Sequence, residues 1–177
     1  ATTGGHSQYM QGLDAGLYAA NAPKTWAWLN EVAPALWRQG KPYPKDAAAL
    51  DTLFARGEID MGMSYHPAHA QMKILEKTYP DTVRTFVMQE GTISNTHFTA
   101  VPFNAPNKAG AMVVADFLMS PEAQLSKYLP ANWGDLPALD MKRLPADMAA
   151  AFAAVDLGAA TLPADALAAA AVPEIPS

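Results

Sequence analysis

The fold follows from residues 56–71, which read RGEIDMGMSYHPAHAQ. Gly57 ends the preceding helix, because glycine tolerates the left-handed conformation of a helix cap. Residues 59–63 alternate Ile and Met with smaller or polar residues, which is typical of a covered α/β strand. Pro67 suits the first position of the next helix. The stretch therefore predicts a turn, a short buried strand, a polar loop and a new helix.

Three polar side chains follow the predicted strand directly: Ser64, Tyr65 and His66. In open α/β sheets, ligands bind outside the carboxyl ends of strands, where the amino ends of helices also point. A hydroxyl, a phenol and an imidazole at that position indicate a ligand-contacting loop. An ordinary strand-to-helix loop would use the same residue types, and the loop alone does not separate these two interpretations.

The composition excludes several classes of protein. The chain has 177 residues, a net charge of −5 and no Cys. Without Cys there are no disulfides, thiolate metal sites or Cys nucleophiles, while the compartment stays open. No basic cluster points to nucleic acid, and no apolar run approaches the ~20 residues of a membrane span. Because the chain starts at Ala1, we expect a processed product, an engineered product or a piece of something longer.

Helices and strands are expected to alternate along the rest of the chain. Ser7 is a candidate N-cap, and the Gly-Gly-His-Ser turn before it leaves backbone N–H groups free for an anion, although a plain cap is the simpler role. Ser120-Pro121-Glu122 predicts a sharp helix start. The remaining predictions are helices over about 7–20, 25–37, 46–56, 67–77, 108–118, 120–128, 145–155 and 162–171, and strands over 83–88 and 96–102.

Three unlike motifs occur in a fixed order along the chain. They are Ala55-Arg56-Gly57-Glu58-Ile59-Asp60, then Thr99-Ala100-Val101-Pro102 with Asn104-Ala105-Pro106-Asn107, then Ala115-Asp116-Phe117-Leu118-Met119-Ser120-Pro121-Glu122-Ala123-Gln124. This succession resembles the carboxyl-terminal half of the type II solute-binding proteins of ABC importers. A subgroup related to the thiamine, iron and polyamine binders is similar also in Leu36-Trp37-Arg38-Gln39-Gly40-Lys41, Gly91-Thr92-Ile93-Ser94-Asn95-Thr96-His97-Phe98 and Asn132-Trp133-Gly134-Asp135.

The resemblance implies an α/β, type II periplasmic-binding-protein-like fold, of which this chain forms part. Such proteins are two-lobed sheet-and-helix structures that bind solute in the cleft between the lobes. By this match, residues 1–90 belong to the second solute-binding lobe. Residues 91–177 supply the hinge return, part of the first lobe and the carboxyl-terminal helices. The amino-terminal half of the family pattern has no counterpart in this sequence.

The candidate ligand-binding residues come partly from the sequence pattern and partly from the resemblance. They are Ser64, Tyr65, His66, Asn95, Thr96, Ser7 and Trp133. The resemblance places Asn95 and Thr96 at the crossover facing the cleft, where hinge hydrogen bonding would need the same residue types. Trp133 lies in a Gly-Asp loop, where an indole could stack on a ring or a cation, or could plug the base of the tail helices.

A metal site is the alternative use of the histidines. His66 and His69 are three residues apart and His97 lies on a later predicted strand, so they could share a metal ion. Pro and Ala between the first two, with no adjacent carboxylate, favour surface or hinge histidines, and no metal site is predicted.

Enzymatic function is not expected, because phosphate-loop, Gly-x-Ser-x-Gly and His-Glu-x-x-His patterns are missing from the sequence. An enzyme on the same fold, such as a porphobilinogen deaminase-like transferase, would need a cofactor-attaching Cys. The resemblance implies the solute receptor of a bacterial ABC importer, periplasmic or lipid-anchored, without a cofactor. Its partners would be a small solute of thiamine-like chemistry and a membrane permease, and the full-length protein is expected to be a monomer.

Overall fold

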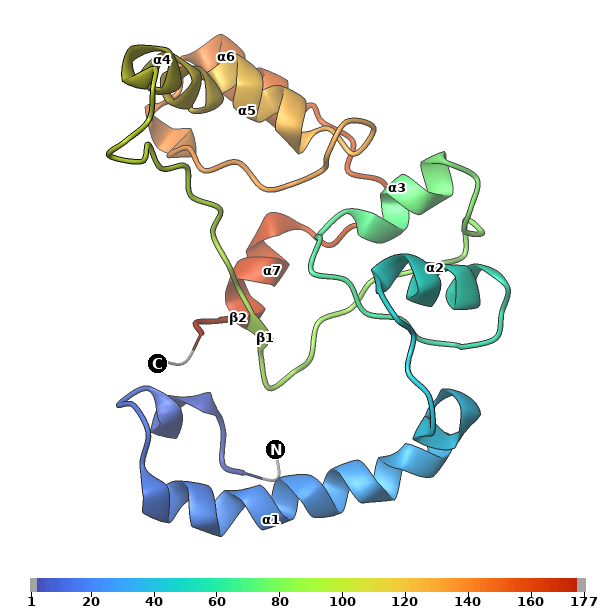
Figure 1. Cartoon of the computed structure of the whole chain (residues 1–177). Helices are drawn as coiled ribbons and strands as arrows, with labels where there is room; N and C mark the ends of the chain where they lie inside the picture. The colour runs from blue at the N-terminus through green and yellow to red at the C-terminus, as the bar shows by residue number, and fades with distance from the viewer. Residues whose placement is uncertain (1–2, 175–177) are drawn as a thin grey trace. The chain divides into compact units, whose positions relative to one another are not determined.

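A computed structural model describes residues 3–174 of the chain (Figure 1). The residues group into two compact units that interleave along the sequence. Unit 1 consists of residues 1–63, 87–95 and 168–177, and unit 2 of residues 64–86 and 96–167. The two units are defined by contacts within this chain and are not the two lobes that the resemblance implies. The assignment of residues 1–90 and 91–177 to two lobes of a larger protein stays a prediction.

The described residues are mainly helical (Figure 1). The α-helices are α1 (Ala15–Val32), α2 (Ala47–Ala55), α3 (His69–Leu75), α4 (Lys108–Leu118), α5 (Pro121–Tyr128), α6 (Ala146–Ala153) and α7 (Ala164–Ala170). The 3₁₀-helices are η1 (His6–Tyr9), η2 (Ala33–Ala35), η3 (Trp37–Gly40) and η4 (Met141–Arg143). The strands are β1 (Thr92–Ile93) and β2 (Ala171–Val172).

Side-chain caps fix the starts of three of these helices. Asp46 accepts a hydrogen bond from the N–H of Ala49 at 2.7 Å at the start of α2. Asn107 caps α4 and Ser120 caps α5 through equivalent bonds of 2.9 and 3.2 Å. Each cap satisfies one of the N–H groups that the first turn of a helix leaves without a partner. The predicted helix starts at these positions are confirmed.

The amino-terminal region differs from its prediction. Ser7 lies inside the short helix η1 and caps nothing, while α1 begins later, with Asp14 accepting from the N–H of Leu17 at 2.9 Å. The helix then runs through Pro23 and joins parts of the stretches predicted as separate helices over 7–20 and 25–37. Within it, the hydroxyl of Thr25 donates to the carbonyl of Asn21 at 3.3 Å. Proline removes one hydrogen bond, and the remaining turns of this long helix tolerate that loss.

The three predicted strands are not strands in the described residues. Segments 59–63, 83–88 and 96–102 carry the expected alternation but have no ladder hydrogen bonds. Met61, Met63, Phe86, Met88 and Phe98 on them are exposed. Strand formation needs a neighbouring strand, because a single extended segment leaves its backbone groups unpaired. The sequence pattern alone does not show where such a neighbour comes from.

The sheet content is therefore much smaller than an α/β fold class implies. One parallel pair joins β1 to β2, with Thr92 opposite Ala171 and Ile93 opposite Val172 (Figure 1). The N–H of Ser94 extends the pair by donating to the carbonyl of Val172 at 2.9 Å. The structure does not show the two-lobed architecture that the resemblance implies.

The core of unit 2 forms around α5. This helix packs against α4 and α6, and the rings of Tyr128 and Phe152 lie 5.9 Å apart. Burial raises the pKa of the Tyr128 phenol. Gln124 is buried and donates from Nε2 to the carbonyl of Leu118 at 2.7 Å, while its Oε1 accepts from the N–H of Ala138 at 2.8 Å. Both polar ends of this buried amide are satisfied, so Gln124 ties the end of α4 to the loop after α5.

Candidate functional site

The candidate site lies in unit 2, where the segment before α3 meets the loop 130–135. Gly134 has a φ of +71° and brings its backbone against Ala68 and Pro130. A Cβ built at Gly134 would lie 2.4 Å from the Cβ of Ala68 and 3.7 Å from Cε1 of His66. Glycine therefore permits both the left-handed turn and the close approach of the loop to His66.

His66 is half-buried at the turn before α3. Its backbone N–H donates to Oγ of Ser64 at 3.1 Å, which fixes the turn that leads into α3. Both ring nitrogens, Nδ1 and Nε2, are buried without a hydrogen-bond partner in the structure. Burial lowers the pKa of His66, and the nearby His69 and His97 lower it further, while Asp135 acts in the opposite direction. The His66 imidazole is therefore neutral, and its two ring nitrogens offer one hydrogen-bond donor and one acceptor.

Trp133 provides the aromatic surface of the site. Its indole is 48% exposed, and the His97 ring lies 6.3 Å from it between centroids, at an interplanar angle of 40°. Nζ of Lys127 lies 5.9 Å from the centre of the indole, at the outer limit of a cation–π contact. One indole thus contacts side chains from α5 and from the extended segment after residue 95.

An ion pair supports the loop beneath Trp133. Nζ of Lys127 lies 3.3 Å from Oδ2 of Asp135, and the two side chains are 18% and 16% exposed. The same ammonium also donates to the carbonyl of Leu136, and the N–H of Asp135 donates to the carbonyl of Lys127 at 3.2 Å. Because the two charges compensate one another, the site is close to electrically neutral when His66 is neutral.

The structure brings some of the predicted site residues together and not others. Ser64, His66 and Trp133 belong to the cluster described above, and Thr96 precedes His97 in the chain. Tyr65 belongs to the same unit but is 90% exposed. In unit 1, Asn95 donates from Nδ2 to Oε1 of Glu174 at 3.3 Å, and Ser7 is exposed on η1. Whether any of these residues contacts solute stays a prediction.

Sequence reasoning missed Lys127 and assigned no role to the Asp135 side chain beyond its nearness to Trp133. Lys127 lies in the last turn of α5, where a basic residue is explained by the helix dipole alone. The sequence feature that could have revealed the pair is the loop between Lys127 and Asp135, because Pro130 and Gly134 turn the chain back onto the end of α5. That return places residues eight positions apart in contact.

No three His, Asp or Glu side chains within residues 3–174 are grouped to hold a metal ion. His69 and His97 lie near enough to His66 to lower its pKa, but the three side chains do not form such a group. The exposed indole, the neutral imidazole and the compensated ion pair offer a ring face and hydrogen-bonding groups to a small molecule.

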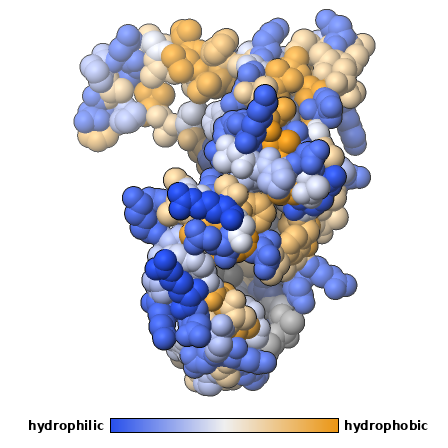
Figure 2. Space-filling model, turned by 90° about the vertical axis from the view of Figure 1, so that its right-hand side faces the viewer, coloured by the Kyte–Doolittle hydropathy of each residue, from blue (hydrophilic) through white to orange (hydrophobic). Residues whose placement is uncertain are grey.

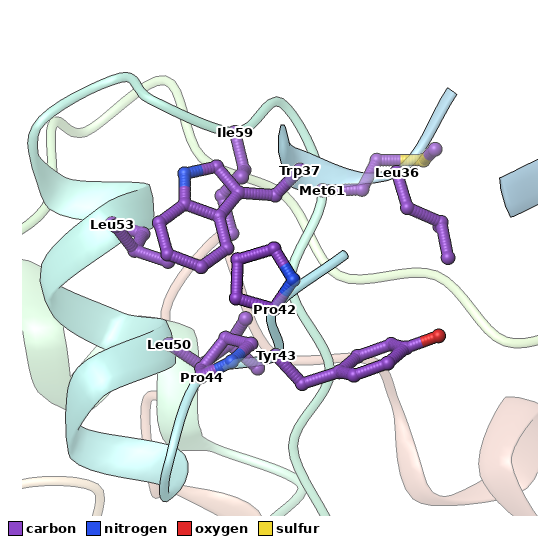
Figure 3. A pocket seen from close by; sticks show the side chains of 9 residues that line it. All are labelled: Leu36, Trp37, Pro42, Tyr43, Pro44, Leu50, Leu53, Ile59 and Met61. Atoms are coloured by element: carbon purple, nitrogen blue, oxygen red, sulfur yellow. The ribbon is translucent and has the colours of Figure 1, made fainter. Parts of the chain in front are cut away.

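A separate apolar pocket of about 160 Å³ lies within unit 1 (Figure 3). Its walls come from η3, the following loop, α2 and the segment predicted as the first strand. The lining residues are Leu36, Trp37, Pro42, Tyr43, Pro44, Leu50, Leu53, Ile59 and Met61. The guanidinium carbon of Arg38 lies 4.5 Å from the centre of the Trp37 ring. The apolar residues of the predicted strand therefore line an open pocket instead of a covered sheet.

Comparison with known proteins defines the class. Residues 3–125 match the family described as bacterial extracellular solute-binding protein, so the chain belongs to this family. It is also 43% identical over 132 residues to Protein YnjB of Escherichia coli strain K12. That alignment covers 75% of this chain and 34% of the relative, so the chain spans about a third of the relative's length. No solved structure matches.

Within the described part of the chain, no helix combines the length and the apolar character that crossing a membrane requires.

Proposed function

We propose that this chain is part of the solute receptor of a bacterial ABC importer. The observation that carries the proposal is the family match over residues 3–125, which include His66 and His97. The receptor would be of type II, would act in the periplasm or on a lipid anchor outside the cytoplasm, and would deliver a small solute to a membrane permease. The full-length protein would be a monomer, with residues 1–90 in its second lobe and residues 91–177 in the hinge return and first lobe.

The solute site is proposed at the cluster of His66, His97 and Trp133. Three observations support this location: the half-exposed indole, the unpartnered ring nitrogens of His66 and the loop that Gly134 presses against them. Ser64 and Thr96 would border the site, and Tyr65 would reach it from its exposed position. Asn95 and Ser7, which belong to unit 1, are proposed as further solute contacts in the full-length protein.

The proposed solute is a small organic molecule with a flat ring, such as a thiamine-like compound. An indole stabilises a cation over its face by ~0.5–2 kcal/mol. The Lys127–Asp135 ion pair leaves the region without a strong net charge, so the ring face would contribute more than charge complementarity. The rest of a larger protein would supply further contacts, including any carboxylate that a cationic solute requires.

The test uses a chimera in which this chain replaces the matching part of the E. coli relative. Its thermal unfolding is measured with thiamine forms, polyamines, amino acids, phosphonates and metal ions. A ligand at ~100 times its dissociation constant should add ~2.7 kcal/mol of stability. Titrations with and without a chelator separate an organic solute from a metal ion.

Two variants locate the site. Trp133→Ala should weaken binding of an organic cation by about 2- to 30-fold, the loss that ~0.5–2 kcal/mol represents. Trp26→Ala, an equally drastic change at an exposed tryptophan of unit 1, should leave binding unchanged. A chimera that responds to no compound argues against the receptor function. Binding that survives Trp133→Ala and His66→Gln undiminished places the site elsewhere.

A further inference from the structure

The protein exposes more surface than its two units would need if each were compact. Its accessible surface is 12893 Å², whereas two compact units of half its mass would expose about 10,000 Å². The buried hydrophobic residues of the described chain are few, and two of the four are alanines: Ala68, Tyr79, Phe152 and Ala160. Figure 2 shows hydrophobic residues at the surface among the hydrophilic ones. About 2,900 Å² is therefore available for contact with something else.

Helix α4 is the clearest example of an unpartnered apolar element. Its sequence, KAGAMVVADFL, is apolar around most of the helix, with charges at Lys108 and Asp116. Ala111 and Ala115 are half-buried and face the rest of unit 2. A helix that is apolar on most sides is usually covered on more than one side.

The opposite side of α4 is exposed. Val113, Val114 and Phe117 are 57–68% exposed, and at 100° per residue they share one face of the helix. We call this set the outer face of α4. Phe98 and Phe103, on the segment that leads into the same helix, are exposed too. Large apolar patches that soluble proteins leave open mark interaction sites.

We propose that the outer face of α4 packs against the part of a full-length solute-binding protein that lies outside this chain. The length of the relative supports this occupant, because two-thirds of it have no counterpart here. The size of the excess surface agrees, since a standard interface takes only about 800 Å² from each partner. A permanent, intramolecular contact accounts for more surface than a second copy meeting on one helix face. The inference rests on family membership and does not require that the receptor binds any particular solute.

The absence of Cys from the sequence allows a direct test with single cysteines. Val113→Cys and Phe117→Cys report on the outer face, and Asp116→Cys, on the polar edge of the same helix, is the matched control. Each variant is made in the 177-residue chain and in the chimera with the E. coli relative. Maleimide labelling is timed without solute, and the labelled residue is identified by mass spectrometry.

In the chain alone, all three cysteines should label rapidly at every protein concentration. In the chimera, labelling at positions 113 and 117 should slow by at least a hundredfold, while position 116 stays reactive. Equal labelling of all three positions in a chimera that unfolds cooperatively would overturn the proposal. So would protection in the chain alone that grows with concentration, because it would assign the face to a second copy. A chimera that does not unfold cooperatively would count against the proposal, because the outer face of α4 would then not pack against the remaining part of the E. coli relative.

Discussion

Replacing Gly134 with Ala tests the packing that holds the candidate site together. The φ of +71° at this residue disfavours any L side chain, at a cost of roughly 1–2 kcal/mol. The new Cβ would also lie 2.4 Å from the Cβ of Ala68 and 3.2 Å from the Cα of Pro130. Forcing an extra methyl group into a packed region costs about 1–3 kcal/mol more. Gly134→Ala should therefore destabilise unit 2 by about 2–5 kcal/mol.

Gly57→Ala is the matched control, because its φ is +69° and no heavy atom of another residue lies within 4 Å of the new Cβ. It should cost only the conformational term, roughly 1–2 kcal/mol. The difference between the two variants then measures the contact of the loop with the segment before α3.

The assay combines urea unfolding with hydrogen exchange read on peptides from each unit, because the two glycines lie in different units. Adding Ala68→Gly to Gly134→Ala removes the closest clashing atom and should restore part of the lost stability, beyond what additivity predicts. The prediction is refuted if Gly134→Ala lowers the free energy of unfolding no more than Gly57→Ala does, or if Ala68→Gly restores none of the lost stability. Either result would mean that the loop 130–135 does not pack tightly against the segment before α3, and the proposed site would lack this support.

Three further predictions concern the same unit. Because burial lowers the pKa of folded His66, the unfolded state binds more protons as the pH falls below about 6.5. The stability that neutral His66 allows is therefore present above that pH and is lost as the pH falls through the folded pKa, by at most ~1.4 kcal/mol per pH unit. His66→Phe should flatten this part of the urea-stability profile, and an unchanged profile would refute the assignment. Lys127→Met should cost about 1–3 kcal/mol by leaving the Asp135 carboxylate without its partner, and Lys127→Met/Asp135→Leu should recover stability in the same unfolding assay. Ser120→Ala should cost ~1 kcal/mol by removing the cap of α5, whereas Ser120→Asp should not.

The capped helices could be predicted from the sequence because capping is local. Ser120, Asn107 and Asp46 each bond to an N–H three residues ahead, so the signal and its partner lie in the same short stretch. The strands could not be predicted in this way. Alternation over 83–88 shows that a segment can form a strand, but pairing depends on residues distant in the sequence. For the same reason β1 and β2, two residues each, carried no recognisable pattern.

The candidate site was predicted in part. His66 and Trp133 were selected separately, one as the end of a strand and the other as an exposed ring in a loop. The structure places His66 beside the loop 130–135, which carries Trp133, although the strand before His66 is not formed. The supporting pair of Lys127 and Asp135 escaped notice, because only the path of the loop brings the two charges together. Asn95 bonds to Glu174 within unit 1, and its place at the hinge of a larger protein stays a prediction.

The interleaving of the two units has a consequence for the order of events during synthesis. Unit 1 takes its pieces from the beginning, middle and end of the chain, and β1 pairs with β2 close to the carboxyl terminus. Asn95 and its partner Glu174 are 79 residues apart, so a ribosome adding 5–20 residues per second needs about 4–16 s between them. Unit 2 is complete once residue 167 has been added, whereas the early part of unit 1 waits through the whole interval with its apolar surfaces open. This region is therefore where a chaperone would be needed most.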